Sequence, residues 1–303
     1  MPTKPIVINF WGVRGSIPTP GPQTVKYGGN TPCVELKFGG EDTFLCDAGT
    51  GIRQFGLFFK SKSEKKTFHI FISHYHWDHI QGLPFLSLLR NKNYTVNIYG
   101  CEEPDHKLES ILSNQMESTY FPVNFSDFEA KINFIPISQG KYLIGEVEIN
   151  TFFVNHPGYA LGYRFDSSGK SIVYISDNEP FALPEEEDNL INDDTSMTAF
   201  DNLIENKNLQ LVEHVKNANI LIHDAQFFPA EYNMHKLWGH SSFIYPIQIA
   251  KLAQVEHVIL FHHDPNHDDT ILDRLYIEAK NYAKSINYGG KVSIAKEMDS
   301  YTL

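Results

Sequence analysis

The sequence has few cysteines and no long apolar run. Cys33, Cys46 and Cys101 are an odd set without CxxC spacing, which is compatible with reduced, mostly buried thiols. No segment offers the roughly 18 consecutive apolar residues of a membrane span, and the N-terminus lacks the apolar stretch of a signal peptide. We therefore expect a cytoplasmic protein with no membrane partner.

Basic residues are also in deficit. The 25 Lys and Arg residues stand against 37 Asp and Glu residues, so the formal net charge is −12. Proteins that bind long nucleic acids do so through clustered Lys and Arg that release counterions. The charge therefore disfavours a long nucleic acid partner and favours a small-molecule substrate.

The chain lacks low-complexity tracts, internal repeats and Pro/Ser linkers. It is 42% hydrophobic and 20% charged over 303 residues, which is typical of a globular protein. We therefore expect a single domain over residues 1–303. The acidic segment 184–201 has no clear periodicity, and we interpret it as a solvated loop in preference to a substrate lid.

Short apolar runs separated by turns predict strands, which dominate the first half of the chain. They cover residues 5–10, 33–38, 43–47, 68–73, 95–100, 132–137, 146–154, 163–165 and 171–176. Helical patterns follow His79 and cover 107–113, 209–217, 242–254 and 269–285. This order predicts two sheets packed face to face with helices outside.

One short stretch, SHYHWDHIQG, concentrates side chains that bind metals. His74, His76, Asp78 and His79 follow the predicted strand 68–73, where the chain leaves the sheet. Imidazole nitrogens and carboxylates are the ligands that zinc and similar divalent metals prefer. The HxHxDH order therefore predicts a metal site at the end of this strand.

Three more polar residues end apolar runs elsewhere in the chain. They are His156 in NHPG, Asp177 in YISDNEP and His262 in LFHHDP. Each is weak evidence by itself, because a His before Pro-Gly is usually a turn residue and an Asp after a strand is usually a helix cap. His263 adjoins His262, and the periodicity does not decide between the two.

These residues, taken in order, resemble the metallo-β-lactamase superfamily of hydrolases. The resemblance covers nearly the whole chain and is closest to the phosphodiesterase branch, which includes ribonuclease Z and cyclic-phosphate phosphodiesterases. Its motifs are HYHWDH, WGVRGS, YGGNTPCVEL, FLCDAGTG, HDAQF and WGHSS. It implies a four-layer αββα sandwich of two mixed β-sheets with external helices.

The resemblance also implies a dinuclear metal site. Its first set of ligands would be His74, His76 and His156, and its second set would be Asp78, His79 and His262, with Asp177 as the bridge. We choose His262 over His263 by the family pattern. The cofactors would be two divalent metal ions, with Zn²⁺ favoured and Mn²⁺ or Fe open.

Two residues would carry the reaction in this interpretation. A metal-bridged hydroxide attacks the substrate, and Asp78 orients it or takes its proton. The resembled phosphodiesterases place the histidine of the GHS motif beside the departing oxygen, so His240 is the candidate proton donor. A helix start capped by Ser241 or Ser242 is compatible with that role.

Four further residues are candidates for supporting roles. Asp47 could fix the tautomer of a ligand histidine, and Asp224 could support His240, although both also suit ordinary turns. Arg14 and Asn30 could bind a substrate phosphate, since Arg makes bidentate bonds to phosphate, but a salt bridge or turn contact is equally compatible.

We therefore predict a metal-dependent phosphodiesterase that cleaves a small or cyclic phosphate diester. Alternatives are a ribonuclease Z-like RNA endonuclease, or a lactone, thioester or β-lactam hydrolase on the same fold. A metal-binding module without activity would require a broken ligand set, and every position is filled. Related phosphodiesterases are often dimers, so the resemblance leaves a homodimer open.

Overall fold

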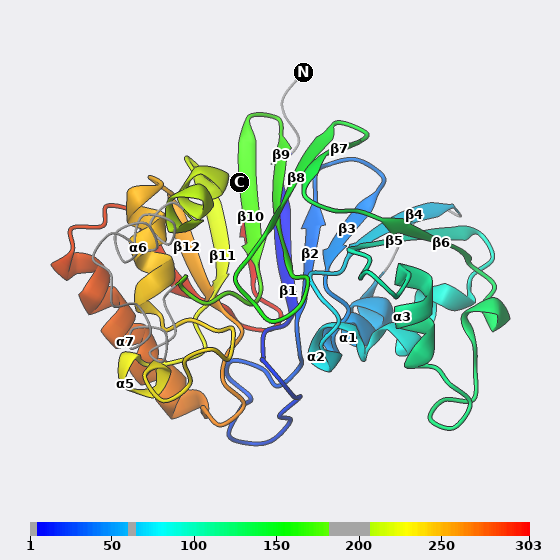
Figure 1. The fold of residues 1–303 in the computed structure, drawn as a ribbon, viewed down its shortest axis with the longest axis horizontal. Coiled ribbons are helices and arrows are strands. Elements are labelled where there is room, and N and C mark those ends of the chain that lie inside the picture. The colour runs from blue at the N-terminus through cyan, green and yellow to red at the C-terminus, as the bar shows by residue number, and fades with distance from the viewer. Residues whose placement is uncertain (1–4, 60–64, 182–206) are drawn as a thin grey trace, which may run out of the picture.

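Two sheets face each other in the computed structural model, which describes residues 5–59, 65–181 and 207–303 (Figure 1). The strand order is β14-β1-β2-β3-β4-β5-β6 in the first sheet and β13-β12-β11-β10-β9-β8-β7 in the second. Both sheets are mixed. In the first, β3 to β6 run parallel, and in the second, β10 to β13 do.

The strands divide between the sheets largely by chain order. The first sheet contains β1 (Val7–Gly12), β2 (Cys33–Lys37), β3 (Thr43–Cys46), β4 (Lys66–Phe71), β5 (Tyr94–Gly100), β6 (Lys131–Pro136) and β14 (Ser300–Thr302). The second contains β7 (Gly140–Ile144), β8 (Val147–Phe153), β9 (Leu161–Ser167), β10 (Lys170–Ile175), β11 (Ile220–Asp224), β12 (His257–Phe261) and β13 (Lys291–Ile294).

Helices cover the outer faces of both sheets (Figure 1). Those beside the first sheet are α1 (Gly51–Phe58), α2 (Trp77–Ile80) and α3 (Leu108–Asn114), with the 3₁₀ turns Leu83–Phe85, Ser87–Arg90 and Phe125–Asp127. The other helical segments are 207–215, α5 (Pro229–Tyr232), α6 (Ile244–Leu252) and α7 (Asp269–Ser285). None of the described helices is long and apolar enough to cross a membrane.

Three apolar cores separate the four layers. The central core lies between the sheets and contains Ile8 and Phe10 of β1 together with Ile259 and Phe261 of β12. The alternate residues of β12 pack instead in the core beneath α6 and α7. The third core lies under α1 and α3. This alternation confirms the predicted αββα sandwich of two mixed sheets.

Several elements differ from the sequence prediction. Helix α1 was not expected, because glycines flank its start and suggested only a tight turn. Strands β7, β11, β13 and β14 were also missed, since runs of three to five residues are too short for periodicity to assign. The helix predicted to follow His79 is instead α2, which begins at Trp77 and ends at Ile80, and the 3₁₀ turn Leu83–Phe85 comes next. The acidic segment 184–201 lies outside the described residues.

Candidate active site

The ends of four strands bring the predicted metal ligands together. His74 follows β4 and His76 is the residue before α2, while His156 follows β8, Asp177 follows β10 and His262 follows β12. The carboxyl ends of β4, β10 and β12 lie at the same edge of the sandwich (Figure 1). Strands that end at one edge deliver their next residues to one place, which explains why residues 188 positions apart in sequence can meet.

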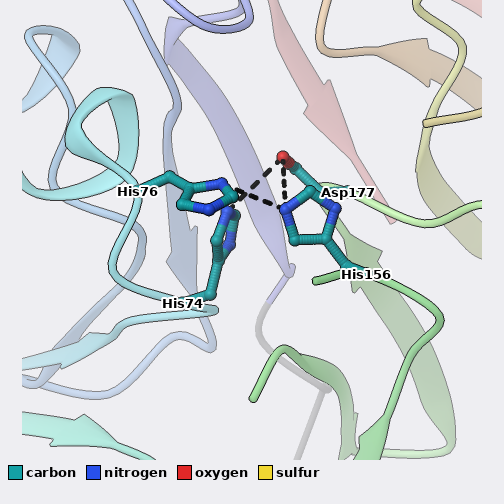
Figure 2. A group of neighbouring side chains, drawn as sticks. All are labelled: His74, His76, His156 and Asp177. Atoms are coloured by element: carbon teal, nitrogen blue, oxygen red, sulfur yellow. Dashed lines mark hydrogen bonds and ion pairs between the residues drawn. The ribbon is translucent and has the colours of Figure 1, made fainter. Parts of the chain in front are cut away.

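The first ligand set consists of three histidines around one carboxylate oxygen. His76 Nδ1 lies 3.1 Å from His156 Nε2. Asp177 Oδ2 lies 3.5 Å from His74 Nε2 and 3.8 Å from His156 Nε2. Figure 2 shows the four side chains with their polar atoms turned toward one another.

The second ligand set faces the other oxygen of Asp177. Asp177 Oδ1 lies 3.2 Å from His79 Nε2 and 3.3 Å from His262 Nε2. Asp78 Oδ2 is 3.1 Å from each of the same two nitrogens. Asp177 therefore presents one oxygen to each set, which is the arrangement expected of a bridging carboxylate.

The donor atoms fit divalent cations. His74 Nε2, His79 Nε2 and Asp177 Oδ1 are buried atoms that form no hydrogen bond. Buried polar atoms are normally satisfied, so such a group requires an explanation. The remaining ring nitrogens of His156 and His262 are occupied, by the Gly239 carbonyl at 2.8 Å and by Gln226 Oε1 at 3.0 Å. These contacts select the tautomer that turns a free nitrogen toward the centre.

The protonation states of the first ligand set and of Asp177 suit metal binding. Burial, with His79 nearby, holds the pKa of His74 well below its usual range, and burial lowers the pKa of His156 to about 4. Burial alone would raise the pKa of Asp177, but the surrounding histidines hold it well below its usual range. Neutral imidazoles and an ionised carboxylate are the forms that bind metals. In the second set, burial opposes the charged form of His79, but the neighbouring carboxylates hold its pKa well above its usual range.

Comparison with known proteins assigns the family. Residues 42–263 match a family model described as a beta-lactamase superfamily domain. The chain belongs to this superfamily. It is a hydrolase with the metallo-β-lactamase fold, and membership implies divalent metal ions as cofactors.

Relatives of this superfamily member include two archaeal enzymes. Ribonuclease Z of Methanococcus maripaludis strain C7 is 27% identical over an alignment of 324 positions, which covers 98% of each chain. Ribonuclease Z of strain C6 is 36% identical over 161 residues, and that match spans about half of each chain, 52% of this one and 48% of the relative. Among solved structures, the metallo-β-lactamase fold protein YhfI from Bacillus subtilis matches with a TM-score of 0.67 and 19% identity over 99% of both chains.

Asp47 organises the second ligand set of this metallo-β-lactamase fold. Its Oδ2 lies 2.8 Å from His79 Nδ1 and accepts hydrogen bonds from Ser73 Oγ at 2.9 Å and Tyr174 Oη at 2.7 Å. Its Oδ1 accepts the Ser73 amide at 2.7 Å. The backbone of Asp47 is left-handed (φ 62°), so the carboxylate leaves the strand direction of β3 and points to the site.

We expect Asp47→Asn to weaken metal binding about 10- to 100-fold, because the amide cannot hold both Ser73 and His79 as donors. Competition with a chelator measures this affinity. Glu35→Gln is the matched control, since Glu35 is an equally buried carboxylate that binds Asn9 and Trp11 instead. Equal affinities of the two variants would contradict the role of Asp47.

His240 lies beside both ligand sets. Its Nδ1 is 3.1 Å from Asp224 Oδ2, which also accepts the Ser241 amide at 3.1 Å. Burial opposes the charged imidazolium, yet the carboxylates of Asp224 and Asp177 raise the pKa of His240 to about 9. Its ring also lies 5.0 Å from that of His262, centre to centre. His240, Asp177 and His262 are close enough to form a further metal-binding group, so position alone leaves two roles for His240.

Glu179 is a site residue that our sequence analysis missed. This buried carboxylate accepts the Leu237 amide at 2.8 Å, the Gly239 amide at 2.9 Å and the Tyr232 hydroxyl at 3.1 Å. Gly239 in turn accepts from His156, so Glu179 holds the loop that positions a ligand and precedes His240. The signal was available in YISDNEP, where this second acidic residue follows Asp177.

The N-terminal WGVRGS motif reaches the site through Ser16 and not through Arg14. The Ser16 amide donates to Asp78 Oδ2 at 2.7 Å. Arg14 is fully buried and donates to the carbonyls of Gly28 and His267 at 2.8 and 2.6 Å. The guanidinium of Arg14 therefore joins two loops, and its expected phosphate contact stays a prediction.

Asn30 does not face the site either. Its Nδ2 donates to Glu297 Oε2 at 3.0 Å, and its amide donates to the same carboxylate. This side chain holds the C-terminal segment in the structure, and its expected contact with a substrate phosphate stays a prediction.

The structure also separates the two adjacent histidines. His262 has a left-handed backbone (φ 59°) and turns into the ligand cluster. His263 is buried elsewhere, where Nε2 lies 2.8 Å from the Ala295 carbonyl and the ring meets Tyr27 edge to face. The strand alternation that left the choice open does not apply, because β12 ends at Phe261.

Proposed function

We propose that this hydrolase cleaves phosphodiester bonds and that its substrate is RNA. The observation that carries the proposal is the His240–Asp224 pair beside two metal-ligand sets that share Asp177. Hydrolysis of a phosphodiester expels an alkoxide, which requires a proton donor. An imidazole held by a carboxylate is suited to supply that proton.

Few residues carry the steps of the proposed reaction. Divalent cations held by the two ligand sets would acidify a water molecule and neutralise charge on the phosphoryl oxygens. Asp78, fixed by the Ser16 amide, orients the attacking water. As the P–O bond to the leaving group breaks, His240 protonates the departing oxygen, and Asp224 stabilises the imidazolium before the transfer.

RNA is proposed first because a relative named Ribonuclease Z matches along nearly the whole chain. This reverses the order of our sequence prediction, in which a small or cyclic diester came first. The small diester stays the second candidate, because the net charge of −12 disfavours long phosphate backbones. Zinc, a count of two metals and a homodimer are likewise proposals.

A substrate panel tests the proposal. We expect the metal-loaded protein to cleave a short RNA with a single-stranded 3′ end and to hydrolyse bis(p-nitrophenyl) phosphate in preference to p-nitrophenyl phosphate. A cyclic nucleotide in the panel distinguishes the second candidate. Metal content is measured on the same sample. Hydrolysis of a lactone or nitrocefin without diester cleavage would contradict the proposed function.

A further inference from the structure

Trp77 is an exposed tryptophan inside the metal-ligand motif. It is the first residue of α2, and the residues after it, Asp78, His79 and Ile80, are all buried. The Trp77 side chain remains 80% exposed. The fold therefore uses α2 to place two ligands inward and leaves a large flat indole beside them in solvent.

This indole lines the pocket that contains the metal ligands. The pocket has a volume of about 460 Å³, within the usual range for small-molecule sites. Its described lining consists of Ser16, Tyr75, His76, Trp77, Asp78, Asp177, His240 and His262. No Lys or Arg is among these described lining residues.

We propose that the Trp77 indole stacks on the nucleobase attached to the scissile phosphate, so that the pocket selects an unpaired nucleotide over a bare phosphodiester. This inference rests on the proposed phosphodiester hydrolysis. Aromatic side chains bind single-stranded nucleic acids by stacking, and they tolerate every base because each has a π face. Stacking also requires no basic surface, which suits a protein of net charge −12.

Trp238 is the other strongly exposed tryptophan near the site, at 61%. Its ring packs edge to face on His235 at 4.7 Å between centres, and it is not among the residues that line the pocket. Trp77 lies between two ligands in sequence, whereas Trp238 precedes the loop glycine Gly239. We therefore assign the nucleobase to Trp77.

The test compares two diesters with one leaving group. Thymidine 5′-(p-nitrophenyl phosphate) and methyl p-nitrophenyl phosphate differ only in the presence of a nucleoside. We expect Trp77→Ala to lower kcat/KM for the nucleoside diester about 5- to 150-fold, mainly through KM, with a much smaller loss on the methyl diester. Trp77→Phe should retain most of the preference. Tyr120→Ala, an equally exposed aromatic (78%) outside the pocket lining, should retain all of it.

Equal losses on both diesters would overturn the proposal, since they would mean that Trp77 acts through its neighbours His76 and Asp78. If Trp77→Ala keeps the wild-type preference for the nucleoside diester over the methyl diester, the proposal is overturned too. If the wild-type protein hydrolyses neither diester, the proposed function fails. The role of Trp77 is then tested separately by the binding of a nucleotide. Thymidine 5′-monophosphate should quench the tryptophan fluorescence of the wild type but not that of Trp77→Phe, which would support stacking on Trp77. Absence of quenching in the wild type would overturn the proposal.

Discussion

Asp177→Ala is expected to remove bound metal and activity together. Metal content should fall from about two ions per chain to fewer than one, and kcat/KM should fall at least about a thousandfold, which corresponds to several kcal/mol of lost transition-state stabilisation. The reason is that Asp177 faces both ligand sets, with Oδ2 near His74 and Oδ1 near His79. Its removal therefore affects both sets at once.

Elemental analysis and a diester assay on the same preparation measure the two effects. Asp166→Ala is the control, because that carboxylate pairs with Arg164 on β9 and lies outside both ligand sets. This control is expected to keep its metal and its activity. If Asp177→Ala keeps either property at the wild-type level, the bridging assignment is wrong.

His240→Ala is expected to slow hydrolysis according to the leaving group. Turnover of a diester with a poor alkoxide leaving group should fall about 10²- to 10⁴-fold, the usual contribution of a general acid. Hydrolysis of bis(p-nitrophenyl) phosphate should fall far less, because p-nitrophenolate leaves without protonation. Metal content should stay unchanged, since His240 is held by Asp224 and is not required by either ligand set.

The metal measurement separates the two roles that position allows for His240. Loss of metal in His240→Ala would identify it as a ligand in the group with Asp177 and His262. Equal losses on both leaving groups with metal retained would remove it as the proton donor. His257→Ala serves as the control, because His257 lies on β12 and contacts Ser293 outside these ligand groups.

Much of the site followed from local sequence signals. The HxHxDH stretch places four ligand-type side chains in one turn, and polar residues after apolar runs mark His156, Asp177 and His262 as strand-end residues. A contact of Asp47 with a ligand histidine was also anticipated, and the structure places Asp47 Oδ2 2.8 Å from His79 Nδ1. The structure brings the ligand-type side chains together. Their positions could be predicted because each depends on a residue type and on the end of a strand, both of which are local properties. Their role as metal ligands stays a prediction.

Other assignments depended on contacts between distant segments. Arg14 appeared suited to phosphate, but the carbonyls of Gly28 and His267 occupy its guanidinium. Glu179 appeared unremarkable until the fold placed the amides of Leu237 and Gly239 against it. The Arg14–His267 and Glu179–Gly239 hydrogen bonds span 253 and 60 residues, so the local sequence does not identify the partner.

Patterns in the sequence alone predicted the two-sheet architecture and marked ligand-type residues at strand ends, because periodicity and strand ends are encoded within short windows. The division of those residues into two ligand sets came from the resemblance to the superfamily. The family pattern selected His262 over His263, and only the tertiary structure showed where each of them lies. It also gave Arg14 and Asn30 partners away from the ligands and placed Trp77 in the lining of the pocket. The physical reason is that these outcomes depend on backbone geometry at a strand end, such as the left-handed φ of His262, and on which buried groups need partners. Both are settled only when the two sheets pack together.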